Sequence, residues 1–128
     1  MIMKVYTDLE QSKKLTEILP IESVDMYYSD NEYPKPITKY HITYANVLYG
    51  SYDIQYFSIY GYVPCWSLAA LLNVLPKGTD IIKEEADTEN ERYMCTVGIK
   101  DDIISTFGNN SVDACYEMII KLHEQKLL

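Results

Sequence analysis

A run of thirteen residues between two prolines, PCWSLAALLNVLP at residues 64–76, constrains the fold more than any other stretch of this chain. Pro64 suits the first position of a helix, where its missing N–H would have no partner, and Pro76 cannot continue the helix. The residues between them are almost all apolar. Because a helix that is apolar all round must be covered on more than one face, the segment predicts a central buried helix over residues 64–75.

A shorter helix is the alternative interpretation of the same segment. Ser67 is a good N-cap residue, and a helix that it caps would run only from Leu68 to Leu75. In either case Ser67 and Asn73 are the natural solvent positions, and the other side chains are expected to be covered by protein.

Helices are also predicted near both ends of the chain. The segment from Asp8 to Leu19 has a helical apolar pattern, with Thr7 or Asp8 as its N-cap and a proline directly after it. In the last helix, Asn110 is expected to be the N-cap and Asp113 to occupy the third position of a capping box. The buried stripe of this last helix is expected to comprise Val112, Cys115, Met118, Ile119 and Leu122.

Alternating apolar and polar residues predict antiparallel strands in the rest of the chain. A tyrosine-rich hairpin is expected within residues 33–62, turning near Gly50, and further strands are expected at residues 81–85, 92–99 and 103–107. Short connections and segregated helices favour an antiparallel α+β fold over a parallel doubly wound sheet. All 128 residues are expected to form one domain, in which the central helix lies between the sheet and the two terminal helices.

The charge balance bears on the class of partner. The chain carries 11 Lys and Arg against 19 Asp and Glu, a formal net charge of −8. Phosphate binding needs clustered basic residues, so nucleic acid is not expected as a direct partner. An acidic protein that imitates nucleic acid stays open as an alternative function, with its carboxylates drawn from residues 21–32 and 87–91.

The N-terminal residues lack the apolar region of a signal peptide, and no run approaches membrane-spanning length, so the protein is expected in the cytoplasm and away from membranes. Three cysteines, an odd number, suit reduced buried thiols. Cys65 would be a nucleophile only if the fold brought His41 or His123 beside it; otherwise it is structural. Two histidines without metal-site spacing indicate no metal site, and no cofactor is expected.

Two stretches resemble a family of short uncharacterised proteins from gut anaerobic bacteria and their phages or mobile elements: PCWSLAALLNVLP at residues 64–76 and DACYEMIIKLHE at residues 113–124. The resemblance covers the N-terminal helix, the central helix and everything after it. Residues 33–62 look like a longer tyrosine-rich insertion without a counterpart. The family has no established activity, so the resemblance implies a small cytoplasmic accessory protein and no catalytic residues.

Tyrosine is the residue type in excess, with 13 against two Phe and one Trp. Ten of the tyrosines lie between Tyr27 and Tyr62. Tyrosine offers a large, rigid contact area with a polar tip, which is why binding surfaces favour it, although rings on a strand also cover a core. The candidate binding residues are Tyr44, Tyr49, Tyr52, Tyr56 and Tyr60.

These observations favour a non-enzymatic protein-binding or regulatory protein of mobile-element type, which contacts a protein partner or a second copy of itself, as a homodimer, through the tyrosine-rich surface. The alternative is a small-molecule-binding protein or enzyme with a pocket near Trp66. Trp66 is then a pocket wall, whereas in the first interpretation it is a core residue whose indole N–H meets an internal acceptor.

Overall fold

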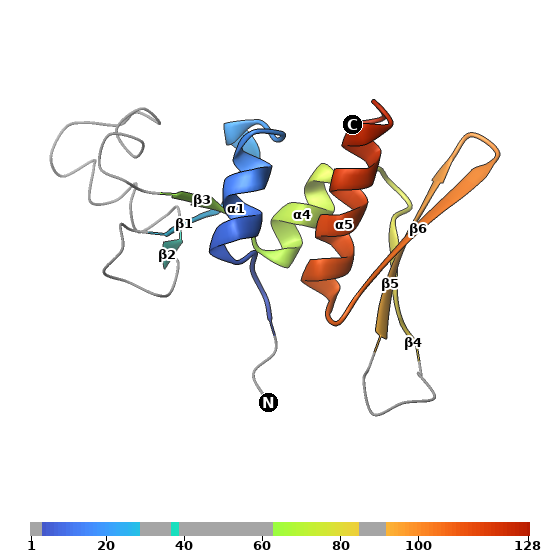
Figure 1. The fold of residues 1–128 in the computed structure, drawn as a ribbon, viewed down its shortest axis with the longest axis horizontal. Coiled ribbons are helices and arrows are strands. Elements are labelled where there is room, and N and C mark those ends of the chain that lie inside the picture. Colours follow the sequence, from blue (N-terminus) through green and yellow to red (C-terminus); the bar gives the residue numbers. More distant parts are fainter. Residues whose placement is uncertain (1–3, 29–36, 39–62, 85–91) are drawn as a thin grey trace, which may run out of the picture.

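The computed structural model describes residues 4–28, 37–38, 63–84 and 92–128, and within these residues the fold is α+β with antiparallel strands, as predicted (Figure 1). The expected tyrosine-rich hairpin, apart from two residues, lies outside the described residues. Helix α1 lies beside a small sheet, and the C-terminal helix α5 lies beside a larger one, with α4 between the two helices in this view (Figure 1).

Helix α1 covers Leu9–Thr16 and begins at a complete capping box between Asp8 and Gln11. It ends before Leu19, where the sequence predicts its end: the Glu17 and Ile18 amides bond three residues back, and Ile18 N–H reaches the carbonyl of Leu15 at 3.0 Å. The proline at position 20 disfavours helical geometry at the residue before it, which accounts for this early loosening.

The small sheet contains β1 (Met26–Tyr28), β2 (Ile37–Thr38) and β3 (Val63–Cys65), in the order β2-β1-β3, and a short 3-10 turn, η1 (Ile21–Ser23), precedes it. Pro64 pairs with Tyr27 in this sheet. The prediction of a helix that starts at Pro64 is therefore wrong. An edge strand tolerates proline because one side of its backbone needs no ladder partner.

Helix α4 covers Leu68–Val74, and the Ser67 side chain caps it by accepting a hydrogen bond from the Ala70 amide at 3.2 Å. The shorter alternative is thus confirmed. Leu71 is fully buried but Leu72 is 38% exposed, so the expectation of cover on every side is wrong. A short helix that packs against α5 and η1 buries one flank and leaves the other in solvent.

The larger sheet contains β4 (Asp80–Glu84), β5 (Arg92–Ile99) and β6 (Asp102–Gly108), in the order β4-β5-β6. These strands confirm the three predicted near residues 81–107. Ile99 pairs with Asp102, so a two-residue turn closes the β5–β6 hairpin, with Lys100 at a φ of 56°. The described chain therefore has two antiparallel sheets where the sequence suggested one.

Helix α5 covers Ser111–Glu124, capped by Asn110 as predicted. It packs on β5 and β6 and also against α4, so α5, and not the central helix, lies against the larger sheet. Its N-terminus approaches Gly108 so closely that a Cβ there would lie 2.6 Å from the Ala114 nitrogen. The predicted stripe of α5 is buried throughout: Val112, Cys115, Met118, Ile119 and Leu122.

Candidate functional site

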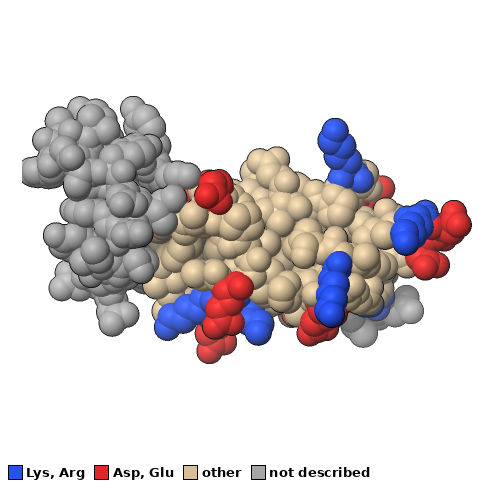
Figure 2. All heavy atoms as spheres, turned by 90° about the horizontal axis from the view of Figure 1, so that it is seen from above, with Lys and Arg blue, Asp and Glu red and all other residues tan. Residues whose placement is uncertain are grey.

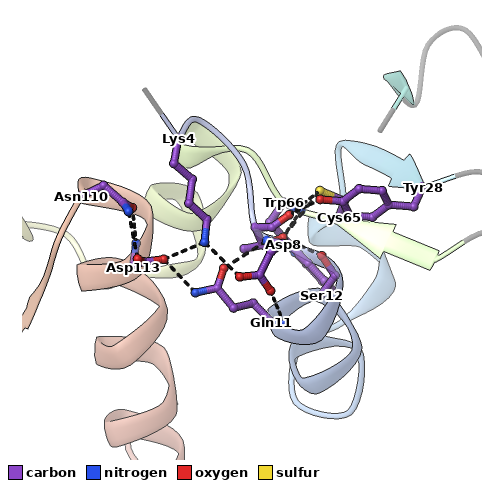
Figure 3. A network of polar contacts seen from close by, with 10 residues as sticks. Lys4, Asp8, Gln11, Ser12, Tyr28, Cys65, Trp66, Asn110 and Asp113 are labelled. Atoms are coloured by element: carbon purple, nitrogen blue, oxygen red, sulfur yellow. Dashed lines mark hydrogen bonds and ion pairs between the residues drawn. The ribbon is translucent and has the colours of Figure 1, made fainter. Parts of the chain in front are cut away.

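Thr7 is the centre of a buried polar junction between α1 and the small sheet, to which Ser12, Tyr28 and Trp66 contribute (Figure 3). Its amide donates to the Trp66 carbonyl at 2.9 Å, and its hydroxyl accepts from the Trp66 amide at 3.2 Å and lies 2.8 Å from the hydroxyl of Ser12. The Tyr28 hydroxyl donates to the Thr7 carbonyl at 2.6 Å. These polar groups satisfy one another, which makes the junction structural.

Asp113 forms a second polar junction, between α1 and the first turn of α5 (Figure 3). Its carboxylate accepts from Lys4 Nζ at 2.8 Å, from Gln11 Nε2 at 2.9 Å and from Asn110 Nδ2 at 2.8 Å. Burial raises the pKa of this carboxyl, but the bonds from Lys4 and Gln11 outweigh it and leave the pKa below its ordinary value. The anion also lies in the first turn of α5, where the helix dipole favours it.

Lys4 is the cation that completes this junction. Its ammonium also donates to Asp8 at 3.0 Å, so it joins the capping box of α1 to the start of α5. Burial lowers the pKa of Lys4, but its bonds to Asp113 and Asp8 outweigh burial and leave the pKa above its ordinary value. The ion pair between Lys4 and Asp113 therefore connects the start of α1 to the start of α5.

The larger sheet has a different character on the face that points away from α5. The side chain of Thr106 donates to the Ala114 carbonyl at 2.8 Å, which fixes the side of β6 that meets the helix. Because side chains alternate along a strand, Ile103 and Phe107 point to the opposite face. That face is open, since Ile103 is 75% exposed and Phe107 is 42% exposed.

An apolar row crosses this open face. Met94 on β5 is paired with Ile82 on β4 and with Phe107 on β6, so the three side chains lie side by side across three strands. Ile82 is 46% exposed. The Arg92 guanidinium stacks on the Phe107 ring, 3.6 Å from its centroid, and Arg92 also pairs with Glu84 at 3.2 Å. We call Ile82, Met94, Ile103 and Phe107 the open-face cluster.

A shallow groove of about 520 Å³ runs beside β6, between the strand and the last turns of α5. One wall is formed by Asp102, Ile103 and Ser105, and the other by Lys121 and Gln125. On this side β6 has no neighbour among the described strands. Ile103 belongs both to the groove and to the open-face cluster. The edge of β6 and the open face of the sheet are therefore continuous at this residue.

Comparison with known proteins finds nothing. No family model, curated protein or solved structure matches this chain.

The cysteines of the described chain are buried in the core, and all are free thiols. Cys65 donates to the Thr7 carbonyl at 3.4 Å, and burial raises the pKa of its thiol, the opposite of what a reactive thiolate needs. His123 is exposed near the end of α5, and His41 lies outside the described residues. Cys65 therefore fits a structural role better than that of a nucleophile.

Trp66 is fully buried, and its indole N–H donates to the Ser23 hydroxyl at 2.9 Å. This is the arrangement expected for a core residue, and the ring has no exposed surface for a ligand or partner. The groove that the structure describes lies beside α5 and β6, away from this ring. The predicted binding tyrosines lie outside the described residues: Tyr44, Tyr49, Tyr52, Tyr56 and Tyr60.

Two further findings limit the kinds of site present. In the part of the chain that the structure describes, no group of three or more His, Cys, Asp or Glu is placed to hold a metal ion. None of the described helices is long and apolar enough to cross a membrane.

The open-face cluster does not follow from the sequence alone. The period-two pattern of Ile103, Ser105 and Phe107 was available in the sequence, and it indicates one face of a strand. Ile104, between them, is apolar as well, so alternation alone does not show which face α5 covers. Only the packing of α5 decides that Ile104 faces inward and Ile103 outward.

Proposed function

We propose that this chain is a non-enzymatic binding protein that contacts another protein through the open face of the β4-β5-β6 sheet. The observation that carries the proposal is the row of Ile82, Met94 and Phe107 across three strands; Ile103 is exposed on the same face, four residues before Phe107 on β6. When a partner covers such a sheet face, the free energy falls by roughly 25 cal/mol per Å² of apolar surface removed from water.

The composition of this face suits a protein partner. Aromatic residues, Met and Arg are enriched where proteins meet, and here an arginine stacks on the ring of Phe107 while a methionine lies next to it. Seen from above the orientation of Figure 1, acidic and basic side chains are mixed over the surface of the described residues (Figure 2).

The tyrosine-rich segment belongs to the same proposal as a second contact surface. It stays a prediction, made from composition and alternation, that Tyr44, Tyr52 and Tyr60 meet a partner. Replacement of the five candidate tyrosines by serine is expected to weaken partner binding or to change the oligomeric state, measured by light scattering. Unchanged binding and an unchanged oligomeric state would remove the segment from the proposal. A cytoplasmic accessory protein of mobile-element type is the cellular role we propose.

Photo-crosslinking tests the open face directly. We would place the photoreactive residue p-benzoylphenylalanine at position 107, and at position 72 as a control, in the cells that make the protein. Leu72 is exposed to a similar extent, 38% against 42%, but lies on α4. We expect protein adducts from position 107 and few from position 72. No adduct at position 107, or equal adducts at both positions, would overturn the proposal.

A further inference from the structure

We propose that a second copy of this chain binds along the free edge of β6, the edge without a neighbour among the described strands, by antiparallel pairing of β6 with β6, so that two three-stranded sheets become one continuous sheet. The inference rests on the proposed function, since it names one protein that the β6 region binds. Its evidence is separate, however: it comes from the backbone of β6 and from the register that this backbone allows.

Alternate residues of β6 direct their backbone groups away from β5. The two-residue turn pairs Ile99 with Asp102, and in such a hairpin the closing pair exchanges both of its hydrogen bonds. Alternate residues of an antiparallel strand direct their N–H and C=O to the same side. Asp102, Ile104 and Thr106 therefore face β5, and Ile103, Ser105 and Phe107 offer their backbone groups to the free edge.

The three outward-facing residues also determine the register of the pairing. A two-fold axis through Ser105 pairs Ser105 with its own copy, and pairs Ile103 with the second copy's Phe107. This is the one symmetric register that pairs all three outward-facing residues, and it forms about six main-chain hydrogen bonds. Isologous pairing of this kind closes into a dimer and leaves no repeating edge at the β6 side.

The side chains of β6 suit that register. Ile103 and Phe107 lie on the open face, so each apolar residue of one copy would lie directly opposite an apolar residue of the other. The most exposed member of the cluster, Ile103, would gain the most cover. Asp102 would lie opposite Gly108 of the second copy, so the pairing sets no two carboxylates against each other.

The same axis places the two α5 helices antiparallel on one face of the joined sheet. Thr106 bonds to Ala114, whereas the start of β6 shares the groove with Lys121, so α5 runs back along β6. Lys121 of one copy therefore comes closer to Glu117 of the other, an exposed residue of opposite charge.

The opposite edge of the sheet provides a contrast. Strand β4 carries Asp80, Lys83 and Glu84 within five residues, and charges of this kind are the usual protection of an edge strand. From Ile103 to Phe107, β6 carries no charge and no proline. The two edges of one sheet thus differ in the feature that permits or prevents strand addition, and β6 is the edge that permits it.

Net charge adds a condition to this dimer. Two copies that each carry a net charge of −8 repel each other, and salt screens this repulsion, whereas backbone and apolar contacts depend little on it. Self-association is therefore expected to strengthen as ionic strength rises, the reverse of a complex held by opposite charges.

Disulfide trapping tests the register. In the proposed dimer the two Cα atoms of position 105 lie about 5.5 Å apart, within the usual range for a disulfide. Ser105→Cys is expected to give an intermolecular disulfide on mild oxidation. Thr96→Cys is the matched control, because Thr96 pairs with Ser105 on the same face but lies one strand further from the axis. We expect at least about ten-fold more trapped dimer from position 105 than from position 96.

Light scattering of the purified full chain gives the second measurement. We expect a dimer that salt strengthens, and a folded monomer for Ser105→Pro, because the lost N–H points away from β5. Circular dichroism checks that this variant keeps its fold. A wild-type monomer at about 100 µM, or equal trapping at positions 105 and 96, would overturn the inference. If position 107 still gave photo-adducts with a different chain, the proposed function would hold and only the choice of partner would be wrong.

Discussion

The two sides of helix α5 are built in opposite ways. On the side toward α1, Asp113 accepts hydrogen bonds from Lys4, Gln11 and Asn110, and the polar groups there have internal partners. On the other side, α5 covers one face of the β4-β5-β6 sheet, and the far face of that sheet presents Phe107 and other apolar side chains to solvent.

This difference separates stability from binding. A polar group that is satisfied inside the protein has little left to offer a ligand, and its removal leaves buried partners unpaired. An exposed apolar group contributes little to folding, and its free energy is released only when something else covers it. We therefore expect substitutions on the α1 side to affect folding, and substitutions on the open face to affect association.

Removal of one aromatic ring from each region tests this expectation most strongly. Trp66→Ala is expected to lower the free energy of unfolding by about 3–5 kcal/mol, because the ring is fully buried. Phe107→Ala is the counterpart on the open face, and its expected cost is about 1 kcal/mol. Urea unfolding at one protein concentration measures both, and equal losses would contradict the division.

Carboxylates provide the next comparison. Asp113→Ala is expected to cost about 2 kcal/mol, because it leaves Lys4 without its closest partner and removes a capping interaction from α5. Asp102→Ala changes an exposed carboxylate and is expected to stay within about 0.5 kcal/mol of wild type. Thermal unfolding of the two variants gives the difference, and similar midpoints would show that the junction is not structural.

The lowered pKa of Asp113 predicts a pH dependence with a definite sign. The carboxyl has a lower pKa when folded than its ordinary value of 3.8, so the unfolded chain binds its proton more readily. The stability that it contributes is present above that value and is lost as the pH falls through the folded pKa. The gap in unfolding free energy between wild type and Asp113→Asn is expected to shrink as the pH falls below 3.8 and through the lower folded pKa. A constant gap would be evidence against the charged junction.

Two neighbours on β6 give the smallest expected change in stability. Ile103→Ser is expected to change the free energy of unfolding of the monomer by less than about 0.5 kcal/mol, while it weakens self-association. Ile104→Ser, on the face toward α5, is expected to cost more than about 1 kcal/mol. Chemical unfolding and light scattering separate the two effects; a strongly destabilised Ile103→Ser would place that residue in the core.

Much of the fold follows from local sequence signals. The bounds of β5 and the cap of α5 were predictable, because alternation over eight residues and an asparagine at an N-cap position are both strong local patterns. The predicted start of the central helix was wrong because Pro64 is compatible with two structures, the first turn of a helix and an edge strand. Its pairing with Tyr27, distant in sequence, decided between the two.

The open-face cluster was harder to predict because it depends on which face of the β4-β5-β6 sheet α5 leaves uncovered. Ile82, Met94 and Phe107 belong to three strands, and their adjacency is a matter of register that no single segment contains. The charges on β4 and their absence from the centre of β6 were visible in the sequence. They became informative only once the strand order showed that β4 and β6 are the two outer strands of this sheet in the part of the chain that the structure describes.

Amide hydrogen exchange at Ser105 tests the central claim, that the free edge of β6 is the surface that binds a second copy. The Thr106 amide faces β5 and serves as the internal reference, protected at every protein concentration. We predict that the Ser105 amide exchanges rapidly in dilute solution and becomes protected as the concentration rises. Rapid exchange at all concentrations, in a sample where light scattering detects a dimer, would place the interface elsewhere and contradict the account.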